Sequence, residues 1–213
     1  MVRDLVTVQL QLRKFADTLP HRLHLLALQP KLRTSWLGLA VSHHVNKQYD
    51  KALDVLIRYE GMQVQIPKHD FDYSELILYH ALVFEDAGRE EEAIEYLDNQ
   101  SAKVIDRFSF ASARARLLLK ADRLKSAELA YRALLEDNPD NYEFIRQYVK
   151  ARGASIGQWC IQTTEWGAES RTDETSEKAL EILDDLFASL PKSSAVRRLS
   201  LRVAAGEQQH VSS

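Results

Sequence analysis

Apolar residues recur every three or four positions along most of the chain, a spacing that places them on one face of an α-helix. In the first such segment Leu5, Val8 and Leu12 form the apolar stripe. We expect Pro20 to end this helix and to open the next one, which Pro30 closes. No segment alternates apolar and polar residues as a half-buried strand does, so the pattern predicts an all-α fold of short antiparallel helix pairs. This first helix is expected over Val2–Leu12, and the later ones over Thr34–Val45, Tyr49–Tyr59, Tyr73–Ala87, Glu90–Asn99, Phe110–Ala121, Leu124–Asp137 and Tyr142–Ala151.

The expected helix pairs follow a repeat. The tetratricopeptide pattern is W-x2-L-G-x2-Y in the first helix and A-x3-F in the second, followed by proline. Trp36, Leu39 and Ala40 fit the first half, and Ala52 and Leu56 follow at the required distance. Second-helix alanines then recur after 41, 34 and 52 residues, of which only the middle interval equals the ideal one. The other matched positions are Ala81, Phe84, Gly88, Ala93, Leu97, Ala115, Leu118, Ala127, Tyr131, Pro139, Ala179, Leu183 and Pro191.

These matched positions predict how the repeats pack. A small side chain such as Ala40 or Ala52 lets the two helices of a pair approach closely, and large ones such as Trp36 and Tyr131 fill the space between neighbouring pairs. A single pair cannot bury its apolar face alone, so neighbours must stack. The pattern therefore predicts a tetratricopeptide-repeat superhelix, an α-solenoid. The alternative is a helical bundle in which the alanines recur by chance.

The repeat pattern is interrupted over residues 153–173, which hold three of the seven glycines together with Trp159 and Trp166. A loop packed on the repeats through these tryptophans and an altered insertion are both open interpretations. We expect a helical repeat array over residues 1–152, an irregular segment over 153–173, further repeat helices over 174–206 and a disordered tail over 207–213.

The sequence carries little of the chemistry that an enzyme requires. It has no glycine-rich phosphate loop, no G-x-S-x-G and no H-E-x-x-H. His21 and His24 are one helical turn apart but have no acidic or cysteine neighbour, which favours ordinary histidines over a metal site. Cys160 is the only cysteine and lies in no recognisable nucleophile pattern. We therefore expect no catalytic residue, no cofactor and no metal.

Composition excludes other classes of protein. No apolar run approaches the roughly 18 residues of a membrane span, and the first apolar stretch contains charges, unlike a secretory signal. A net charge of −3 and a pI of about 6.2 argue against direct DNA binding. We therefore expect a cytoplasmic protein that makes no membrane contact.

Charge is unevenly distributed along the chain. Residues 1–33 have a net charge of +4, and residues 68–98 carry ten acidic residues against Lys68 and Arg89. A late cluster without acidic residues follows. Such clusters are either solvated helix faces or electrostatic contacts with RNA or an acidic partner. The late cluster consists of Lys192, Arg197, Arg198 and Arg202.

Beyond the general repeat, the chain resembles the auxiliary subunit of the N-terminal acetyltransferase A (NatA) complex. The similar features are the pattern around Trp36, the YSEL-LY run at Tyr73–Tyr79, the NP-N turn at Asn138–Asn141 and a late VRRLSL stretch at residues 196–201. The resemblance spans about residues 3–206, with 153–173 poorly matched. The stretches that carry it are LQPKLRTSWLGLAVSHHVNKQYDKALDVL, DFDYSELILYHALVFEDAGREEEAIEYL, RLLLKADRLKSAELAYRALLEDNPDNY and ILDDLFASLPKSSAVRRLSL.

This resemblance implies a non-catalytic scaffold. Auxiliary subunits of this family wrap the catalytic acetyltransferase subunit and dock the complex on ribosomes, where nascent N-termini are acetylated. The expected partners are therefore the catalytic N-terminal acetyltransferase subunit and the ribosome. Family members are several times longer, so the region that chiefly embraces the enzyme, and an inositol phosphate pocket of some members, would fall beyond residue 213.

The competing interpretation is a generic tetratricopeptide-repeat adaptor that binds peptide C-termini. Such adaptors hold the terminal carboxylate with polar and basic residues on the first helices of their repeats. The corresponding inner-face positions here are Leu37, Val41, Leu78 and Leu82, which cannot pair with a carboxylate.

Overall fold

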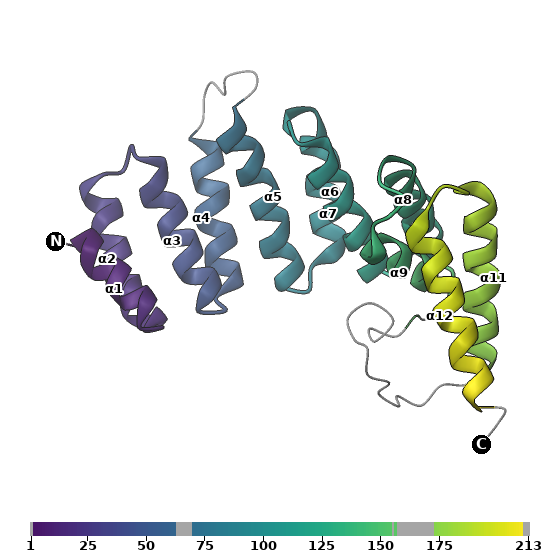
Figure 1. Ribbon diagram of the computed structural model, residues 1–213. Coiled ribbons are helices and arrows are strands. Elements are labelled where there is room, and N and C mark those ends of the chain that lie inside the picture. The colour runs from purple at the N-terminus through teal and green to yellow at the C-terminus, as the bar shows by residue number, and fades with distance from the viewer. Residues whose placement is uncertain (1, 63–69, 155, 157–172, 211–213) are drawn as a thin grey trace. The chain divides into compact units, whose positions relative to one another are not determined.

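The structure is a computed structural model that describes residues 2–62, 70–154, 156 and 173–210. Within these ranges the chain is helical between turns and forms no strand, which confirms the all-α prediction (Figure 1). The helices are α1 Val2–Gln11, α2 Phe15–Leu28, α3 Arg33–Val45, α4 Tyr49–Gly61, α5 Phe71–Asp86, α6 Glu90–Gln100, α7 Arg107–Lys120, α8 Leu124–Asp137, α9 Tyr142–Ala151, α11 Asp173–Ser189 and α12 Ser194–His210, with a 3-10 turn at Ser101–Lys103.

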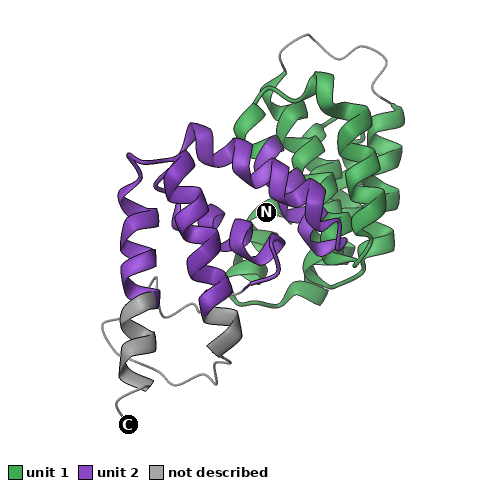
Figure 2. Cartoon of the chain, turned by 90° about the vertical axis from the view of Figure 1, so that its right-hand side faces the viewer, with its two compact units in different colours: residues 1–110 green, residues 111–213 purple. Residues whose placement is uncertain are grey.

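The chain divides into two compact units, Met1–Phe110 and Ala111–Ser213 (Figure 2). In the first unit, α1 packs on α2, α2 on α3, α3 on α4, α4 on α5 and α5 on α6. In the second unit, α8 packs on α9 and α11 on α12. Within each unit these helices pack against their neighbours along the chain, as a repeat array requires.

The same turn recurs between the helices. One residue of each turn has a positive φ, and the next residue donates its backbone N–H to the carbonyl five positions earlier. This is the Schellman arrangement, which satisfies carbonyls at a helix C-terminus. The intervals between successive turns are 34, 41, 34 and 31 residues. The positive-φ residues are Arg13, Lys47, Gly88, Asp122 and Gly153.

Most of the predicted packing positions are buried. The alanines at helix crossings, from Ala40 to Ala179, are at most 2% exposed. Trp36 is only half-buried: its indole N–H donates to the carbonyl oxygen of Pro30 at 2.8 Å, and its ring lies 6.3 Å from that of Tyr59. Of the remaining predicted positions Gly88, Pro139 and Pro191 are not buried, and all the others are.

The predicted apolar stripe of the first helix is wrong. Leu5, Val8 and Leu12 are 44%, 48% and 61% exposed, whereas Val6 is 1% exposed. Val6 lies 34 residues before Ala40 and occupies the matching packing position in the first pair. The stripe misleads because it follows helical spacing, but the side of α1 that packs on α2 is set by the repeat.

The predicted break at Pro20 is also wrong, because Pro20 lies inside α2. The first helix instead ends at Gln11, and the turn around Arg13 separates it from α2. Pro20 is the sixth residue of α2, so the helix loses one backbone bond, to the carbonyl of Ala16, and continues past it.

Side-chain caps set where several first helices of the pairs begin. The carboxylate of Asp70 accepts the N–H of Tyr73 before α5, and Asp106 accepts that of Ser109 in α7. The amide oxygen of Asn141 likewise caps α9. Such caps satisfy the unpaired N–H groups of a helix start. They place the start of α7 at Arg107, three residues before the predicted start.

The segment predicted to be irregular is described only at its beginning and end. Gly153 has a positive φ, and Ala154 and Ile156 are 5% and 3% exposed. Trp159, Trp166 and Cys160, with the predictions made for them, lie outside the described residues. The helix α12 continues to His210, past the expected end of the repeat helices at residue 206.

Candidate interaction surfaces

The described residues contain no group of three or more histidine, cysteine or acidic side chains placed to hold a metal ion. None of the helices in the described ranges has the length and hydropathy needed to cross a membrane. The candidate sites are therefore surfaces, and their geometry depends on the junctions between helices.

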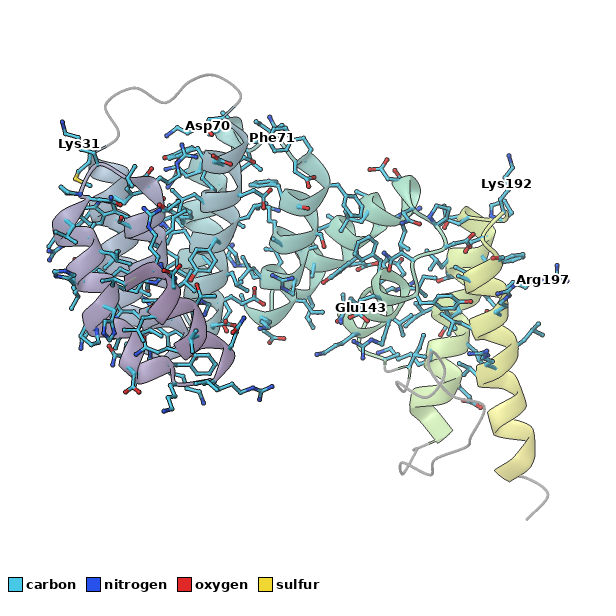
Figure 3. The ribbon with its side chains drawn as sticks, turned by 60° about the vertical axis from the view of Figure 1, so that its left-hand side comes forward. Lys31, Asp70, Phe71, Glu143, Lys192 and Arg197 are labelled. Atoms are coloured by element: carbon cyan, nitrogen blue, oxygen red, sulfur yellow. The ribbon has the colours of Figure 1, made fainter. Side chains whose placement is uncertain are left out.

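A cluster around Arg33 fixes the junction of α3, α4 and α5. Its guanidinium donates to the Tyr59 hydroxyl at 3.1 Å and to the Asp70 carboxylate at 2.8 Å, and it lies 2.7 Å from the carboxylate of Asp72. The bond from Arg33 holds the pKa of Asp70 below its usual range. This cluster joins the start of α3 to the start of α5, where Asp70 lies beside Phe71 (Figure 3).

A second cluster is buried between α4, α5 and α6. The Glu60 carboxylate accepts a bond from the Tyr96 hydroxyl at 2.5 Å and from Nδ1 of His80 at 3.0 Å. Burial raises the pKa of Tyr96, so its hydroxyl keeps its proton and acts as a donor. His80 is 1% exposed and stacks on Phe84. Its Nε2 has no partner among the described residues. Glu60 accepts both bonds through Oε1, so the contacts that this cluster shows join the three helices.

His44 connects the end of α3 to α5. Its Nδ1 lies 3.0 Å from the Tyr79 hydroxyl and its Nε2 lies 2.9 Å from the Asp86 carboxylate. Burial, with a smaller effect of Asp86, raises the pKa of Tyr79 to about 12. These contacts set α3 against α5.

Accessible apolar side chains remain beside this contact. On α3, Val41 and Val45 are each 40% exposed, and Leu37 is half-buried. On α5, Leu82 is 37% exposed and Leu78 is half-buried. The sequence analysis assigned four of these positions, Leu37, Val41, Leu78 and Leu82, to the inner face. The structure leaves all four at least partly accessible.

A shallow cavity of about 310 Å³ lies at the turn before α4. Lys47, Lys51 and Arg89 line it together with Asp50. The guanidinium of Arg89 is already held by Glu92 at 2.5 Å and lies 3.5 Å from Asp50. Because the Arg89 guanidinium is already paired with acidic side chains, only the exposed lysines Lys47 and Lys51 are left to meet an anion. The cavity therefore lacks the arranged donors of an anion-binding site.

The basic cluster predicted at residues 192–202 lies at the start of α12. The carboxylate of Asp140 accepts the N–H of Ala195 at 3.0 Å and the hydroxyl of Ser193 at 3.1 Å, which anchors this helix to the turn between α8 and α9. The Ala195 bond lowers the pKa of Asp140. Lys192 and Arg197 point away from the helices (Figure 3).

Four cationic side chains of this cluster are exposed. Leu201 among them is 64% exposed, so the face combines positive charge with one apolar side chain. The role of Lys192, Arg197, Arg198 and Arg202 in binding stays a prediction.

One relevant cation escaped the sequence analysis. Arg22 lies in α2 against Gly38 of α3, half-buried and next to the accessible side of α3. Only the glycine of the W-x-G triplet at Trp36 could have indicated a close neighbour at that point.

Comparison with known proteins places these surfaces in context. The model of a family described as "N-terminal acetyltransferase A, auxiliary subunit" matches residues 71–212. The N-terminal acetyltransferase A complex auxiliary subunit NAA15 of Arabidopsis thaliana is 33% identical over 208 residues. The match covers 94% of this chain and 22% of that protein, so the chain spans about a fifth of the length of this relative.

Two solved structures are similar. The first is a structure of Naa15/Naa10 bound to HypK-THB, with a TM-score of 0.75 and 29% identity, covering 94% of this chain and 28% of that chain. The second is a tetratricopeptide repeat protein from Parabacteroides merdae, with a TM-score of 0.58 and 13% identity, covering 97% of this chain and 71% of that chain. The second similarity concerns the fold alone, and it agrees with the predicted repeat type.

Proposed function

Because the chain belongs to the family of NatA auxiliary subunits, we propose that it is a non-catalytic scaffold that binds the catalytic acetyltransferase subunit of such a complex. The observation that carries the proposal is the family match over residues 71–212, together with the likeness to Naa15 in a structure that also contains Naa10. In this proposal the chemistry belongs to the separate catalytic chain, and the protein works in the cytoplasm during translation.

The packed junctions support a scaffold role. Arg33, His44 and Glu60 each connect a helix of one pair to a helix of the next. A partner laid along the first unit would therefore meet helices whose relative positions are fixed in advance, which lowers the entropy lost on binding. The accessible side chains of Val41 and Leu82 supply apolar contact area for such a partner.

The basic face of α12 supports a second contact, with ribosomal RNA. Lys192, Arg197 and Arg198 are exposed, have no acceptor among the described residues, and face solvent beside Leu201. Phosphate contacts of this kind weaken steeply as salt displaces the protein, because binding releases counterions.

Co-expression with the catalytic subunit tests the first part. We expect the chain to retain the catalytic subunit through affinity purification and gel filtration at moderate salt. A folded chain that retains no catalytic subunit would contradict the scaffold proposal and favour a generic tetratricopeptide-repeat adaptor.

Ribosome sedimentation tests the second part. We expect the chain to sediment with ribosomes at low salt and to be released as salt rises. The variant Lys192→Glu/Arg197→Glu/Arg198→Glu should lose sedimentation, whereas Arg58→Glu, which changes an exposed arginine paired with Asp54 in α4, should keep it. Equal behaviour of the two variants would remove α12 from the contact.

A further inference from the structure

Arg22 is a cation without a counterion. It extends from α2, and its Nε is buried with no hydrogen-bond partner among the described residues. No carboxylate in those ranges forms an ion pair with it, and burial lowers its pKa. A buried donor that lacks an acceptor destabilises a fold, so such groups are rare unless something else compensates.

Gly38 makes room for this guanidinium. A Cβ placed on Gly38 would lie 2.5 Å from Nη1 of Arg22 and 2.9 Å from its Cζ. Any other residue at position 38 would therefore push the arginine away from α3. The guanidinium therefore lies in a notch of α3 that the missing side chain of Gly38 leaves open.

The outer end of the guanidinium remains open. Nε is the only nitrogen of Arg22 that is both buried and unpaired, so Nη1 and Nη2 keep access to solvent. Two parallel N–H groups at that end match the two oxygens of a carboxylate. Beside the notch, α3 presents Leu37 and Val41, which are accessible and apolar.

We propose that Arg22 binds a carboxylate of a partner polypeptide docked on α3, with apolar residues of that polypeptide against Leu37 and Val41. This proposal rests on the proposed scaffold function in one respect: it takes the partner to be a protein. A polypeptide fits better than RNA because the arginine of α3 itself, Arg33, is engaged by Asp70 and Asp72. A single cation flanked by apolar side chains cannot follow a phosphate backbone.

The test uses the whole chain and arrays of octapeptides. One array has a central glutamate with varied flanking residues, and the matched array has glutamine in its place. We expect the chain to bind a subset of the glutamate peptides at least tenfold more tightly than their glutamine counterparts. The preference should disappear in Arg22→Met and persist in Arg58→Met, which removes an exposed arginine of α4.

Two further readouts separate binding from structure. Arg22→Met should fold with an unchanged or higher melting temperature, since it removes an unpaired buried donor. Gly38→Ala keeps the charge but moves the guanidinium out of its notch, and should lower the glutamate preference at least tenfold while the chain stays folded.

Other results would overturn the proposal. These are absence of any glutamate preference, an equal preference in Arg22→Met, or displacement of the peptides by oligouridine RNA at lower concentration than by free glutamate peptide. The arrays contain no catalytic subunit, so failure here leaves the scaffold proposal standing. If the chain fails to co-purify with the catalytic subunit but still prefers glutamate peptides, the scaffold proposal fails and the Arg22 proposal stands.

Discussion

The first two helix pairs have the same backbone plan but different packing. Both pairs turn through a residue with positive φ, Arg13 in the first and Lys47 in the second, 34 residues apart. The second pair places Ala40 and Ala52 where its helices meet. The first pair has Val6 and Thr18 at the equivalent positions, and both are at most 1% exposed. The repeat is therefore defined by turn geometry and spacing, and alanine is one of several residues that satisfy it.

The two pairs also differ in how each is joined to the next helix along the chain. Neutral groups join α2 to α3: the Thr18 hydroxyl lies 3.2 Å from Ser42 Oγ, and the Asn46 amide donates to the carbonyl of Phe15 at 3.0 Å. Charged groups join the second pair to α5, chiefly Arg33 with Asp70. Helix packing alone requires neither the neutral nor the charged contacts. The two junctions should therefore respond differently to mutation and to pH.

The largest expected effect comes from crowding the second pair. Ala52 is fully buried, and Ala52→Leu inserts three carbon atoms between helices. We expect a loss of about 3 kcal/mol in the free energy of unfolding, measured by urea denaturation. Ile57→Leu in the same helix is the control, because Ile57 is 56% exposed and should tolerate the change. Similar effects of the two variants would show that α4 does not pack closely through Ala52.

The first pair should respond to loss of a hydroxyl instead. Thr18→Val keeps the shape but removes the donor that bonds the Phe15 carbonyl at 2.6 Å and contacts Ser42. We expect a loss of about 1.5 kcal/mol, because Ser42 is left buried without this partner. Adding Ser42→Ala in a double-mutant cycle should recover part of the loss. An additive cycle would mean that the two hydroxyls do not interact.

Sequence patterns identify the second pair correctly and mislead about the first for a physical reason. The tetratricopeptide pattern encodes small side chains at crossings, so Ala40, Ala52 and Ala93 could be recognised. Val6 and Thr18 meet the same packing requirement with different residues, and helical spacing alone favoured the exposed stripe at Leu5.

The polar contacts were beyond sequence reasoning for another reason. Arg33 and Asp70 are 37 residues apart, and Arg22 meets Gly38 only because two helices cross there. Neither of these contacts in space can be predicted from the local periodicity of the sequence. The inner-face positions Val41 and Leu82, by contrast, follow from helical register and were predicted.

Acid should weaken the charged junction and leave the neutral one unchanged. The folded pKa of Asp70 is below its ordinary value of about 3.9, so its stabilising contribution is complete above that pH and is lost as pH falls through the folded pKa. Asp70→Asn should cost about 1 kcal/mol at pH 7 and flatten this acid dependence.

Hydrogen exchange of α5 and α2 at pH 6 and pH 3 measures the difference. Protection at the start of α5, corrected for the intrinsic exchange rate at each pH, should fall at pH 3 in the original chain, relative to protection in α2. The asparagine variant should show a smaller change between the two pH values. An equal loss of protection in both helices would indicate global acid unfolding rather than loss of this ion pair.

The smallest effect concerns the turn that both pairs share. Arg13 and Lys47 adopt φ values of 55° and 57°, which are unfavourable for residues with a Cβ. Arg13→Gly and Lys47→Gly should each raise the free energy of unfolding by about 0.5 kcal/mol, since glycine relieves more strain than it adds in unfolded-state entropy. Gly88→Ala, at a φ of 72°, should cost about 1 kcal/mol in the same urea experiment. Equal gains at Arg13 and Lys47 would mean that the two pairs differ only where their helices touch. A gain at one position alone would show that the first pair is a variant of the repeat in its backbone as well.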